Sequence, residues 1–562
     1  MKTRSSKVFL LLSVMVTLGL LLSACALAAP SAPAPTKAPE VKAPTPAPAK
    51  PTPAPAAAEE KPQYGGILNI ATYTDAPSYD AHQESTIGTL LLAGPVYNNI
   101  VQYSPEDNTK VIGDLAERWE VSPDGLTYTF YFPKGAKWHD GKPFTAEDAR
   151  FTLDRIRKPP KGMNSIRRDL FQGIKSIDVV DDNTLKVTLD AARASFIPLL
   201  AMGWNVVVPK HVVEPLGGKK ISTKEAIGTG PYVLKEYIRG VKVLLPKNPD
   251  YFIKGRPYVN GMDIFIITDP GATLAALRAG QVHHVSGVML TPIEADIVRK
   301  SSPEIKLIKA NSLLFPHFGV NPQRKPLNDI RVRKAIFLTL DRQAANKILQ
   351  ADEGLVGGPI SPGSYYALPQ EELLKMPGYR QPKDQDIAEA KKLMAEAGYA
   401  DGFDAEIKTW GSKINQDLAV FLIDQMKRIN VRMKMNFMET AAFYAAADKR
   451  DYDVYAWSMG VAIEDPDQMF GEHYLTGAPR NYGDYTIPGF DELYLKQSQT
   501  MDREERRKLV WEMQRMIMDH YLKAVAFWRT VYAPVRPEMH GYYGAVGLYN
   551  NLRFQDVWLS QR

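Results

Sequence analysis

The sequence lacks the residue types and spacings of common catalytic motifs. It has no HExxH pair, no Walker A phosphate loop and no GxSxG nucleophile turn. Ser458 lies in Ala-Trp-Ser-Met-Gly, which lacks the first glycine of the nucleophile turn, and Gly228-Thr-Gly-Pro is typical of an ordinary turn. We therefore expect no catalytic residue and no enzymatic activity, with a hydrolase as the alternative class.

Potential metal ligands are also sparse. Cys25 is the only cysteine, which excludes an internal disulfide and any CxxC metal site. His283 and His284 are adjacent, and adjacent side chains on a strand point to opposite faces, so one ion can hardly bind both. The sequence therefore predicts no metal site and no cofactor.

The composition is that of a large chain with several packed cores. The 562 residues are 45% hydrophobic and 23% charged, and this length suggests two or more lobes. The net charge of +6 includes Lys2, Arg4 and Lys7, which lie in a segment that we expect to be removed; 66 basic and 63 acidic residues then remain. The basic residues are spread along the chain, which argues against a nucleic-acid partner.

The N-terminus has the layout of a secretory signal. Residues 1–24 combine a short basic start, an apolar run and small residues before Cys25. Leu22-Ser23-Ala24-Cys25 resembles the lipobox of bacterial lipoproteins, which implies that Cys25 carries a diacylglycerol and a further acyl chain. More than one acyl chain is what stable anchoring requires. We expect an extracytoplasmic protein anchored by lipid to the cell membrane, in the periplasm or on the outer face of the cytoplasmic membrane.

A spacer follows the anchor. Residues 25–62 are rich in alanine, proline, lysine and glutamate, and such a segment buries too little apolar surface to fold. Repeated Ala-Pro and Thr-Pro steps favour polyproline II at about 3.1 Å per residue, so the spacer reaches up to roughly 100 Å.

Strands and helices are interleaved beyond residue 62. Alternating apolar and polar residues predict half-buried strands at 126–132 and 185–189, and a short apolar strand spans 67–71. Together with the helices this is an α/β pattern.

Helix starts are marked by capping residues. Thr145 and Asp148 form a capping box ahead of a helix at 149–156, a second helix spans 387–397, and Asp502 opens a long third helix. We assign the apolar stripe of the third helix to core packing: Leu509, Met513, Met516 and Ile517.

Five segments carry the motifs of a known family. The most specific one spans 115–156 and contains Lys134-Gly-Ala-Lys-Trp-His-Asp-Gly. The others are Gly228-Thr-Gly-Pro-Tyr, Pro326-Leu-Asn-Asp-Ile-Arg-Val-Arg-Lys-Ala-Ile, the stretch 391–410, and Tyr452-Asp-Val-Tyr-Ala-Trp457 followed by Asp465-Pro466. In these motifs and their order, the chain from Tyr64 onward resembles the extracellular solute-binding proteins of ABC importers, family 5, the oligopeptide, dipeptide and nickel class.

This resemblance implies a two-lobed α/β fold of the periplasmic-binding-protein type, with the ligand between the lobes. Lobe I would comprise 63–99, 190–314 and 531–562, with an extra subdomain at 100–189, and lobe II would comprise 315–530. Hinge closure buries the ligand in such proteins. The chain would act as a monomer that delivers a small organic solute to an ABC permease with its ATPase subunits.

Two departures from the family pattern bear on the ligand. In peptide-binding relatives an acidic residue three positions after the tryptophan of the fifth segment pairs with the peptide amino group, and in some an arginine three positions before it grips the carboxylate. Here these positions hold Gly460 and Val454. Both departures argue against a plain peptide with free charged ends, because a buried charge needs a partner.

The residues that we predict to line the cleft are mainly aromatic. They are Tyr73, Trp410, Trp457 and Tyr482, with the polar neighbours Glu464, Asp465 and Asn481. Aromatic platforms with few charges suit sugars, neutral or modified peptides, or amphipathic organic molecules; a metal chelate stays open through the family. Core packing is the alternative role of each aromatic residue, and Glu464 could replace the missing acid if its loop folds inward.

One rival function uses the same binding chemistry. A receptor that presents its ligand to a sensory or signalling system would differ only in its partner, so this sequence does not separate the two functions.

Overall fold

The computed structural model describes residues 61–560, apart from positions 85, 108–109, 288, 412, 479 and 545–551. Lys61–Arg562 forms one compact unit. The predicted signal peptide 1–24, the lipidation site Cys25 and almost all of the spacer 25–62 lie outside the described residues and stay predictions. Within the described part, no helix is both long and apolar enough to cross a membrane.

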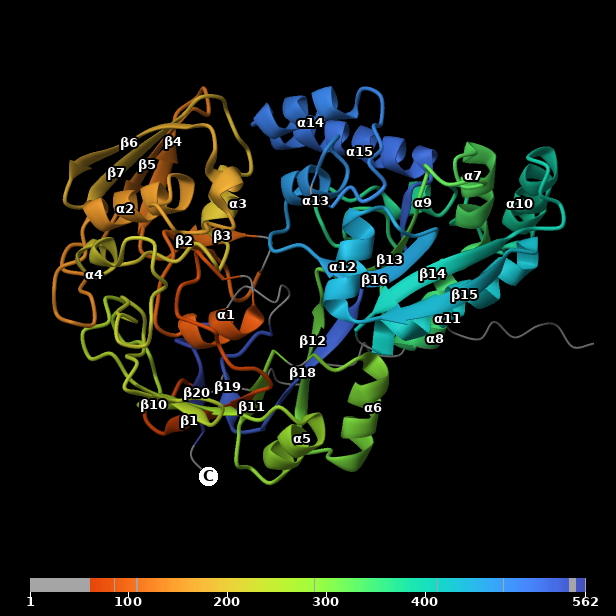
Figure 1. The fold of residues 1–562 in the computed structure, drawn as a ribbon. Helices are drawn as coiled ribbons and strands as arrows, with labels where there is room; N and C mark the ends of the chain where they lie inside the picture. Colours follow the sequence, from red (N-terminus) through yellow and green to blue (C-terminus); the bar gives the residue numbers. More distant parts are fainter. Residues whose placement is uncertain are drawn as a thin grey trace, which may run out of the picture. The chain divides into compact units, whose positions relative to one another are not determined.

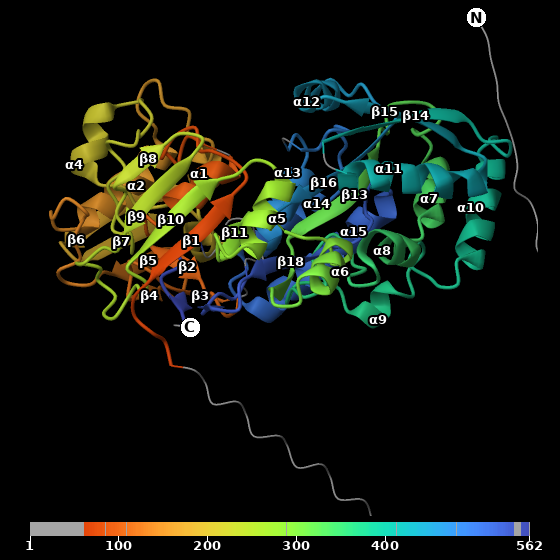
Figure 2. The same cartoon turned by 90° about the horizontal axis from the view of Figure 1, so that it is seen from below.

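A seven-stranded mixed sheet underlies lobe I (Figure 1). Its strand order is β12-β18-β11-β1-β10-β9-β8. β1 runs parallel to both β10 and β11, so the three carboxyl ends point the same way; Figure 2 shows these strands side by side, with α5 next to β11. The strands are β1 Ile67–Thr72, β8 Glu236–Ile238, β9 Lys242–Pro246, β10 Gly261–Ile266, β11 His284–Ser286, β12 Lys306–Asn311 and β18 Thr530–Val535.

A four-stranded antiparallel sheet, in the order β4-β5-β7-β6, shares the apolar core of lobe I. In β5 and β7 the buried positions alternate with less buried ones, as predicted. The predicted Thr145–Asp148 capping box is present and starts α2. The remaining elements here are β2 Val101–Tyr103, β3 Val111–Gly113, β4 Arg118–Val121, β5 Thr127–Tyr131, α2 Ala146–Arg157, β6 Ile174–Asp181 and β7 Thr184–Leu189.

Shorter elements complete lobe I. Ala71 and the buried residues of α5 and α6 form a small core of their own below the seven-stranded sheet. These elements are α1 Ile87–Ala93, α3 Phe196–Leu200, α4 Lys210–Val213, α5 Pro270–Arg278, α6 Pro292–Ser301, β19 Met539–His540 and β20 Trp558–Leu559.

A five-stranded sheet, in the order β15-β14-β16-β13-β17, underlies lobe II. β14, β15 and β16 are parallel, whereas β13 runs antiparallel to both β16 and β17. The strands are β13 Leu314–Val320, β14 Asp404–Trp410, β15 Arg432–Met438, β16 Val454–Gly460 and β17 Lys523–Val525.

Helices cover both faces of this sheet (Figure 1). One apolar core lies between the sheet and α7, α8, α10 and α11, and a second one lies between the other face and α12, α13, α14 and α15. The predicted helices are confirmed as α10 and α15, and Met513 and Ile517 of the predicted stripe are buried. The helices are α7 Ile330–Thr339, α8 Arg342–Gln350, α9 Gln370–Leu373, α10 Asp384–Glu396, α11 Lys413–Met426, α12 Thr440–Asp448, α13 Pro466–His473, α14 Phe490–Gln499 and α15 Arg503–His520.

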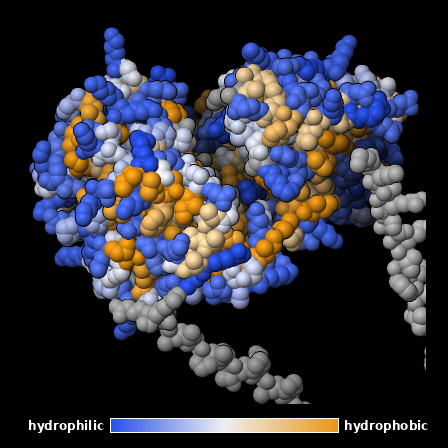
Figure 3. Space-filling view, turned by 60° about the horizontal axis from the view of Figure 1, so that its bottom comes forward, coloured by the Kyte–Doolittle hydropathy of each residue, from blue (hydrophilic) through white to orange (hydrophobic). Residues whose placement is uncertain are grey.

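The chain crosses between the two large sheets at two adjacent places. β12 leads into β13 and β17 leads into β18. The two connections are hydrogen-bonded to each other, from Ser312 N to Arg529 O over 2.8 Å and from Arg529 N to Leu314 O over 3.2 Å. A pair of such crossings is the usual place of a hinge. The predicted two-lobed α/β fold is confirmed, and Figure 3 shows the two lobes as two masses with an indentation between them. The residue boundaries of the lobes stay predictions.

Candidate ligand-binding site

An aromatic cluster lies where β14 ends, beside the middle of β16. The ring centroids of Trp410 and Trp457 are 5.9 Å apart. Phe443 and Tyr444 of α12 contact both indoles at centroid separations of 5.1 to 6.1 Å, and Tyr482 lies 6.1 Å from Trp457. The structure thus brings together three predicted residues, Trp410, Trp457 and Tyr482, and adds two that the sequence analysis missed.

Strand pairing explains this grouping. β14 and β16 are parallel, with Lys408 opposite Tyr455, so Trp410 and Trp457 fall next to each other two residues further on. α12 follows β15 and packs against β14, which brings Phe443 and Tyr444 over the indoles. In open α/β sheets, ligands bind outside the carboxyl ends of the strands. One signal could have pointed to the two missed residues, Phe443 and Tyr444: both lie on α12, the first helix after β15.

Trp457 is fixed by a hydrogen bond to the next strand. Its side chain is 2% exposed, and its Nε1 donates to Nε2 of His317 on β13 over 3.0 Å. Because Nε2 accepts this bond, the imidazole is neutral and carries its proton on Nδ1. Burial, followed by the nearby cation of Lys523, holds the pKa of His317 well below its ordinary value.

The other indole has no such bond. Nε1 of Trp410 is buried and lacks a hydrogen-bond partner among the described residues. A buried donor without an acceptor costs about 1–3 kcal/mol, so an atom of this kind calls for an explanation. The cluster therefore contains one buried indole donor without a partner among the described residues.

The loop that carries Glu464 folds inward. Val461 belongs to the apolar core of lobe II, whereas Ala462 and Ile463 are buried in the core of lobe I. Glu464 itself is half-buried. Burial raises the pKa of its carboxyl to about 7, and the hydroxyl of Ser364 acts in the opposite direction. A small cavity beside Glu464 is lined mainly by apolar side chains, among them Leu313, Ile360, Val461, Met469 and Trp528.

Two of the predicted polar residues have structural partners. Asp465 caps α13, and its carboxylate oxygens accept hydrogen bonds of 2.7 and 2.9 Å from the guanidinium of Arg506. Nδ2 of Asn481 donates to the carbonyl oxygens of Leu475 and Tyr485 over 3.0 and 2.8 Å. These bonds make both residues supports of the loops around the cluster, and their contact with a ligand stays a prediction.

Tyr73 occupies the corresponding edge of lobe I. It follows β1 directly, and its ring packs so closely on Gly287 that a Cβ added there would lie 2.9 Å from the ring. Tyr73 therefore lies at the carboxyl ends of the parallel strands of the lobe I sheet, as Trp410 does at the end of β14 in lobe II.

Direct hydrogen bonds join lobe I to α13 and α14 of lobe II. The hydroxyl of Ser195, at the start of α3, donates to the carboxylate of Asp467 on α13, and Ala194 N donates to Ser498 O over 2.9 Å. Ser195 and Asp467 are buried. Burial acts to raise the pKa of Asp467, but Arg506 and the Ser195 hydroxyl hold it below its ordinary value. The start of α13 thus links the Glu464 loop to lobe I.

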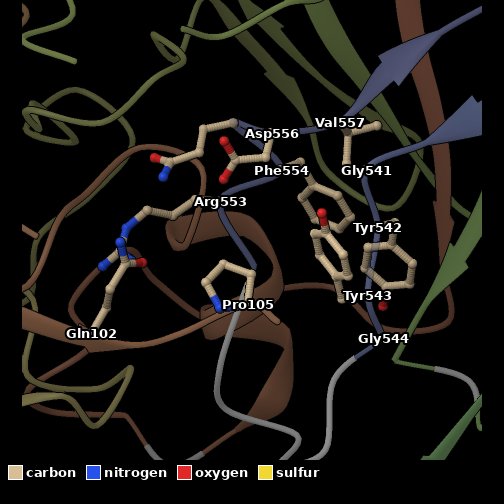
Figure 4. Close-up of a pocket in the computed structure, with 11 residues that line it drawn as sticks. Gln102, Pro105, Gly541, Tyr542, Tyr543, Gly544, Arg553, Phe554, Asp556 and Val557 are labelled. Atoms are coloured by element: carbon tan, nitrogen blue, oxygen red, sulfur yellow. The ribbon is translucent and has the colours of Figure 1, made fainter. Parts of the chain in front are cut away.

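Another cavity lies wholly in lobe I, beside the C-terminal segment (Figure 4). Tyr542, Tyr543, Phe554 and Gln102 are among its lining residues, and Arg553 extends toward Gln102. The guanidinium of Arg553 is already engaged, with Gln102 Oε1 at 2.6 Å and with further acceptors: Tyr97 O, Asn99 Oδ1 and Asp114. Arg553 thereby holds the C-terminal segment against the rest of lobe I.

The two adjacent histidines have separate partners. Nδ1 of His283 accepts from Asn69 N over 2.9 Å, and Nδ1 of His284 lies 3.0 Å from Pro534 O. Within the described residues, no group of three or more histidine, cysteine or acidic side chains is placed to hold a metal ion.

The chain is similar to known binding proteins along most of its length. Residues 110–481, more than half of the chain, match the model of the bacterial extracellular solute-binding proteins, family 5 (middle region). The dipeptide-binding protein of Escherichia coli K12 is 27% identical over 506 residues, which cover 84% of this chain and 89% of the relative. Heme-binding protein A of Haemophilus influenzae is 25% identical over 479 residues, which cover 80% of this chain and 84% of the relative.

Solved structures agree with the sequence matches. The ABC transporter substrate-binding protein CtaP of Listeria monocytogenes has a TM-score of 0.78 to this chain at 25% identity, and the match covers 89% of this chain and 100% of that one. The fold, the paired crossings between two sheets and the match over residues 110–481 lead to one conclusion. The chain belongs to family 5 of the bacterial extracellular solute-binding proteins.

Proposed function

We propose that this substrate-binding protein is lipid-anchored at Cys25, captures a small organic ligand between its lobes and delivers it, as a monomer, to an ABC permease with ATPase subunits. The lipobox-like sequence before Cys25 and the spacer 25–62 support the anchor. The names of the relatives, which are binding proteins for a dipeptide and for heme, support an organic ligand. The protein binds its ligand without altering it chemically.

One observation carries the assignment of the site. The aromatic cluster at the end of β14 and the middle of β16 contains a buried indole donor, Trp410 Nε1, without a partner among the described residues. A ligand with a flat or apolar portion and a nearby hydrogen-bond acceptor would cover the rings and satisfy this donor. Glu464, on the loop that contacts lobe I, would accept a hydrogen bond from an amino or hydroxyl group of the ligand. Neutral or modified peptides fit this description.

Ligand binding would shift an equilibrium between open and closed lobes. The Glu464 loop and the start of α13 touch lobe I through Ile463 and through the Ser195–Asp467 hydrogen bond. Closure would therefore bury the ligand and restore these contacts together, and the permease would recognise the closed form.

The proposed function is tested in two steps. Mass spectrometry of the purified protein identifies the small molecule that co-purifies, and calorimetry with that compound measures its affinity and stoichiometry. Saturable one-to-one binding without turnover supports the proposal, whereas release of a reaction product would support the hydrolase. Loss of uptake in a strain that lacks the protein supports transport, and unchanged uptake with a lost response would support the sensory receptor.

A further inference from the structure

Asn415, on the first turn of α11, bridges the two strands that carry the indoles, at the end of β14 and within β16. Its Nδ2 donates to Trp410 O over 2.9 Å, and its Oδ1 accepts from Ser458 N over 2.7 Å. The side chain is 3% exposed. One amide therefore holds the backbone at Trp410 and the backbone next to Trp457.

This bridge stands where strand pairing stops. β14 and β16 pair over two residues of their described length, Ile407 with Val454 and Lys408 with Tyr455. Beyond Lys408 the two strands are no longer held by the ladder, and both indoles lie in this part. The Asn415 amide supplies the next pair of hydrogen bonds between the strands, and a buried bond of this kind is worth about 1 kcal/mol.

We propose that Asn415 is a positioning residue that sets the separation and tilt of Trp410 and Trp457 and thereby the affinity of the aromatic site. The inference rests on the proposed function, because it assumes that ligand contacts these rings. The indoles are 5.9 Å apart with their planes inclined by 57°, and a binding surface needs its side chains held close to the productive geometry.

The chain offers a matched control at the opposite end of β16. Nδ2 of Asn321 donates to Arg450 O and Tyr452 O over 2.9 and 3.1 Å, and its Oδ1 accepts from Gln323 N over 3.0 Å. Asn321 is 1% exposed and has the same bridging chemistry, but it holds the amino end of the strand, away from the indoles. A purely structural role would make the two asparagines equivalent.

The experiment compares Asn415→Ala, Asn415→Asp and Asn321→Ala. Asn415→Asp keeps the size of the side chain and the acceptor for Ser458 N but places a carboxyl oxygen against Trp410 O. A melting curve of each variant establishes that it is folded before the coupling is measured. Far-ultraviolet circular dichroism reports the coupling of the two indoles, isolated as the difference between each protein and the same protein with Trp410→Phe. Affinity is measured by native mass spectrometry with a defined pool of di- and tripeptides whose ends are neutralised by N-acetylation and C-amidation.

We expect both Asn415 variants to lose about half or more of the indole coupling and to bind the peptides about tenfold more weakly, which corresponds to roughly 1.4 kcal/mol. Asn321→Ala should change both quantities less than about twofold at a comparable loss of melting temperature. Unchanged coupling in the Asn415 variants, or equal losses in Asn321→Ala, would overturn the inference. If the wild-type protein binds no peptide of the pool, the proposed ligand class fails, and the coupling measurement still decides the role of Asn415.

Discussion

Nε1 of Trp457 donates a hydrogen bond of 3.0 Å to Nε2 of His317, across neighbouring strands of the lobe II sheet. The bond links residues 140 positions apart, and it requires a neutral imidazole because Nε2 must accept. Burial keeps the imidazole neutral at physiological pH. One indole of the cluster is therefore held by the fold, while Nε1 of the neighbouring Trp410 has no partner among the described residues.

A double-mutant cycle tests the Trp457–His317 bond. His317→Phe leaves the buried indole donor without an acceptor, and we expect it to lower the free energy of unfolding by about 1–3 kcal/mol. The double variant His317→Phe, Trp457→Phe removes both polar partners, so it should lose less than the sum of the single changes. Chemical denaturation of the four proteins measures this coupling, and strict additivity would show that the bond contributes nothing.

Glu464 should make the folded protein less stable as pH rises through neutrality. Its folded-state pKa of about 7 lies above the ordinary value of 4.5, so between these values the folded state retains a proton that the unfolded state has lost. Stability therefore falls as pH increases from 4.5 to 7. Glu464→Gln should remove this dependence and exceed the wild-type protein at pH 8 by on the order of 2 kcal/mol.

The matched comparison for Glu464→Gln is the same pair of proteins at pH 5, where the wild-type carboxyl is protonated and the two should be nearly equal. Denaturation curves at both pH values provide the test. A constant difference between the proteins would show that the carboxyl does not titrate in this range.

Lys523 should make the folded protein more stable as pH rises above neutrality, which is opposite to the effect of Glu464. Burial, reinforced by the cation of Arg480, lowers its pKa from 10.5 to about 7. Nζ lies 3.3 Å from Nδ1 of His473 and donates to Arg480 O over 3.2 Å. Between pH 7 and 10.5 the unfolded state binds the extra proton, so stability rises with pH in this window. Lys523→Met should flatten this rise, although it also loses the hydrogen bond to Arg480 O. Denaturation curves of both proteins at pH 7 and pH 10 measure the change; an equal rise in the two proteins would contradict the lowered pKa.

Ser195 should bias the lobes toward closure. Its hydroxyl bonds to Asp467 across the lobes, whereas the hydroxyl of Ser498 bonds to the same carboxylate within lobe II. Ser195→Ala should therefore favour the open form by about 1 kcal/mol, and Ser498→Ala is the control that loses an equivalent bond without an interlobe contact. Small-angle X-ray scattering of the ligand-free proteins measures opening; an equal radius of gyration for both variants would contradict this role.

Local patterns in the sequence predicted helices and strands better than they predicted which distant side chains contact each other. The Thr145–Asp148 capping box and the alternation in β5 and β7 depend on neighbouring residues, and both are present. The partner of Asp465 is Arg506, 41 positions further along the chain, and no local pattern indicates this pair.

In the aromatic site, too, the sequence indicated some residues but not the contacts between distant parts of the chain. The family motifs pointed to Trp410 and Trp457, but the position of α12 over their rings depends on how β14, β15 and β16 assemble. The bridging amide of Asn415 likewise becomes recognisable only once the parallel ends of β14 and β16 lie together.

The central claim, that a ligand occupies the aromatic cluster and accepts a hydrogen bond from Trp410, is tested most directly by comparing Trp410→Phe with Trp457→Phe in calorimetric titrations of the co-purified molecule. Each change keeps an aromatic ring and removes one indole N–H. Trp410→Phe should weaken binding about tenfold and cost the fold no hydrogen bond, because no described protein group accepts from Nε1. Trp457→Phe should instead destabilise the fold, because it leaves Nε2 of His317 unpaired. Wild-type affinity in Trp410→Phe would contradict the account.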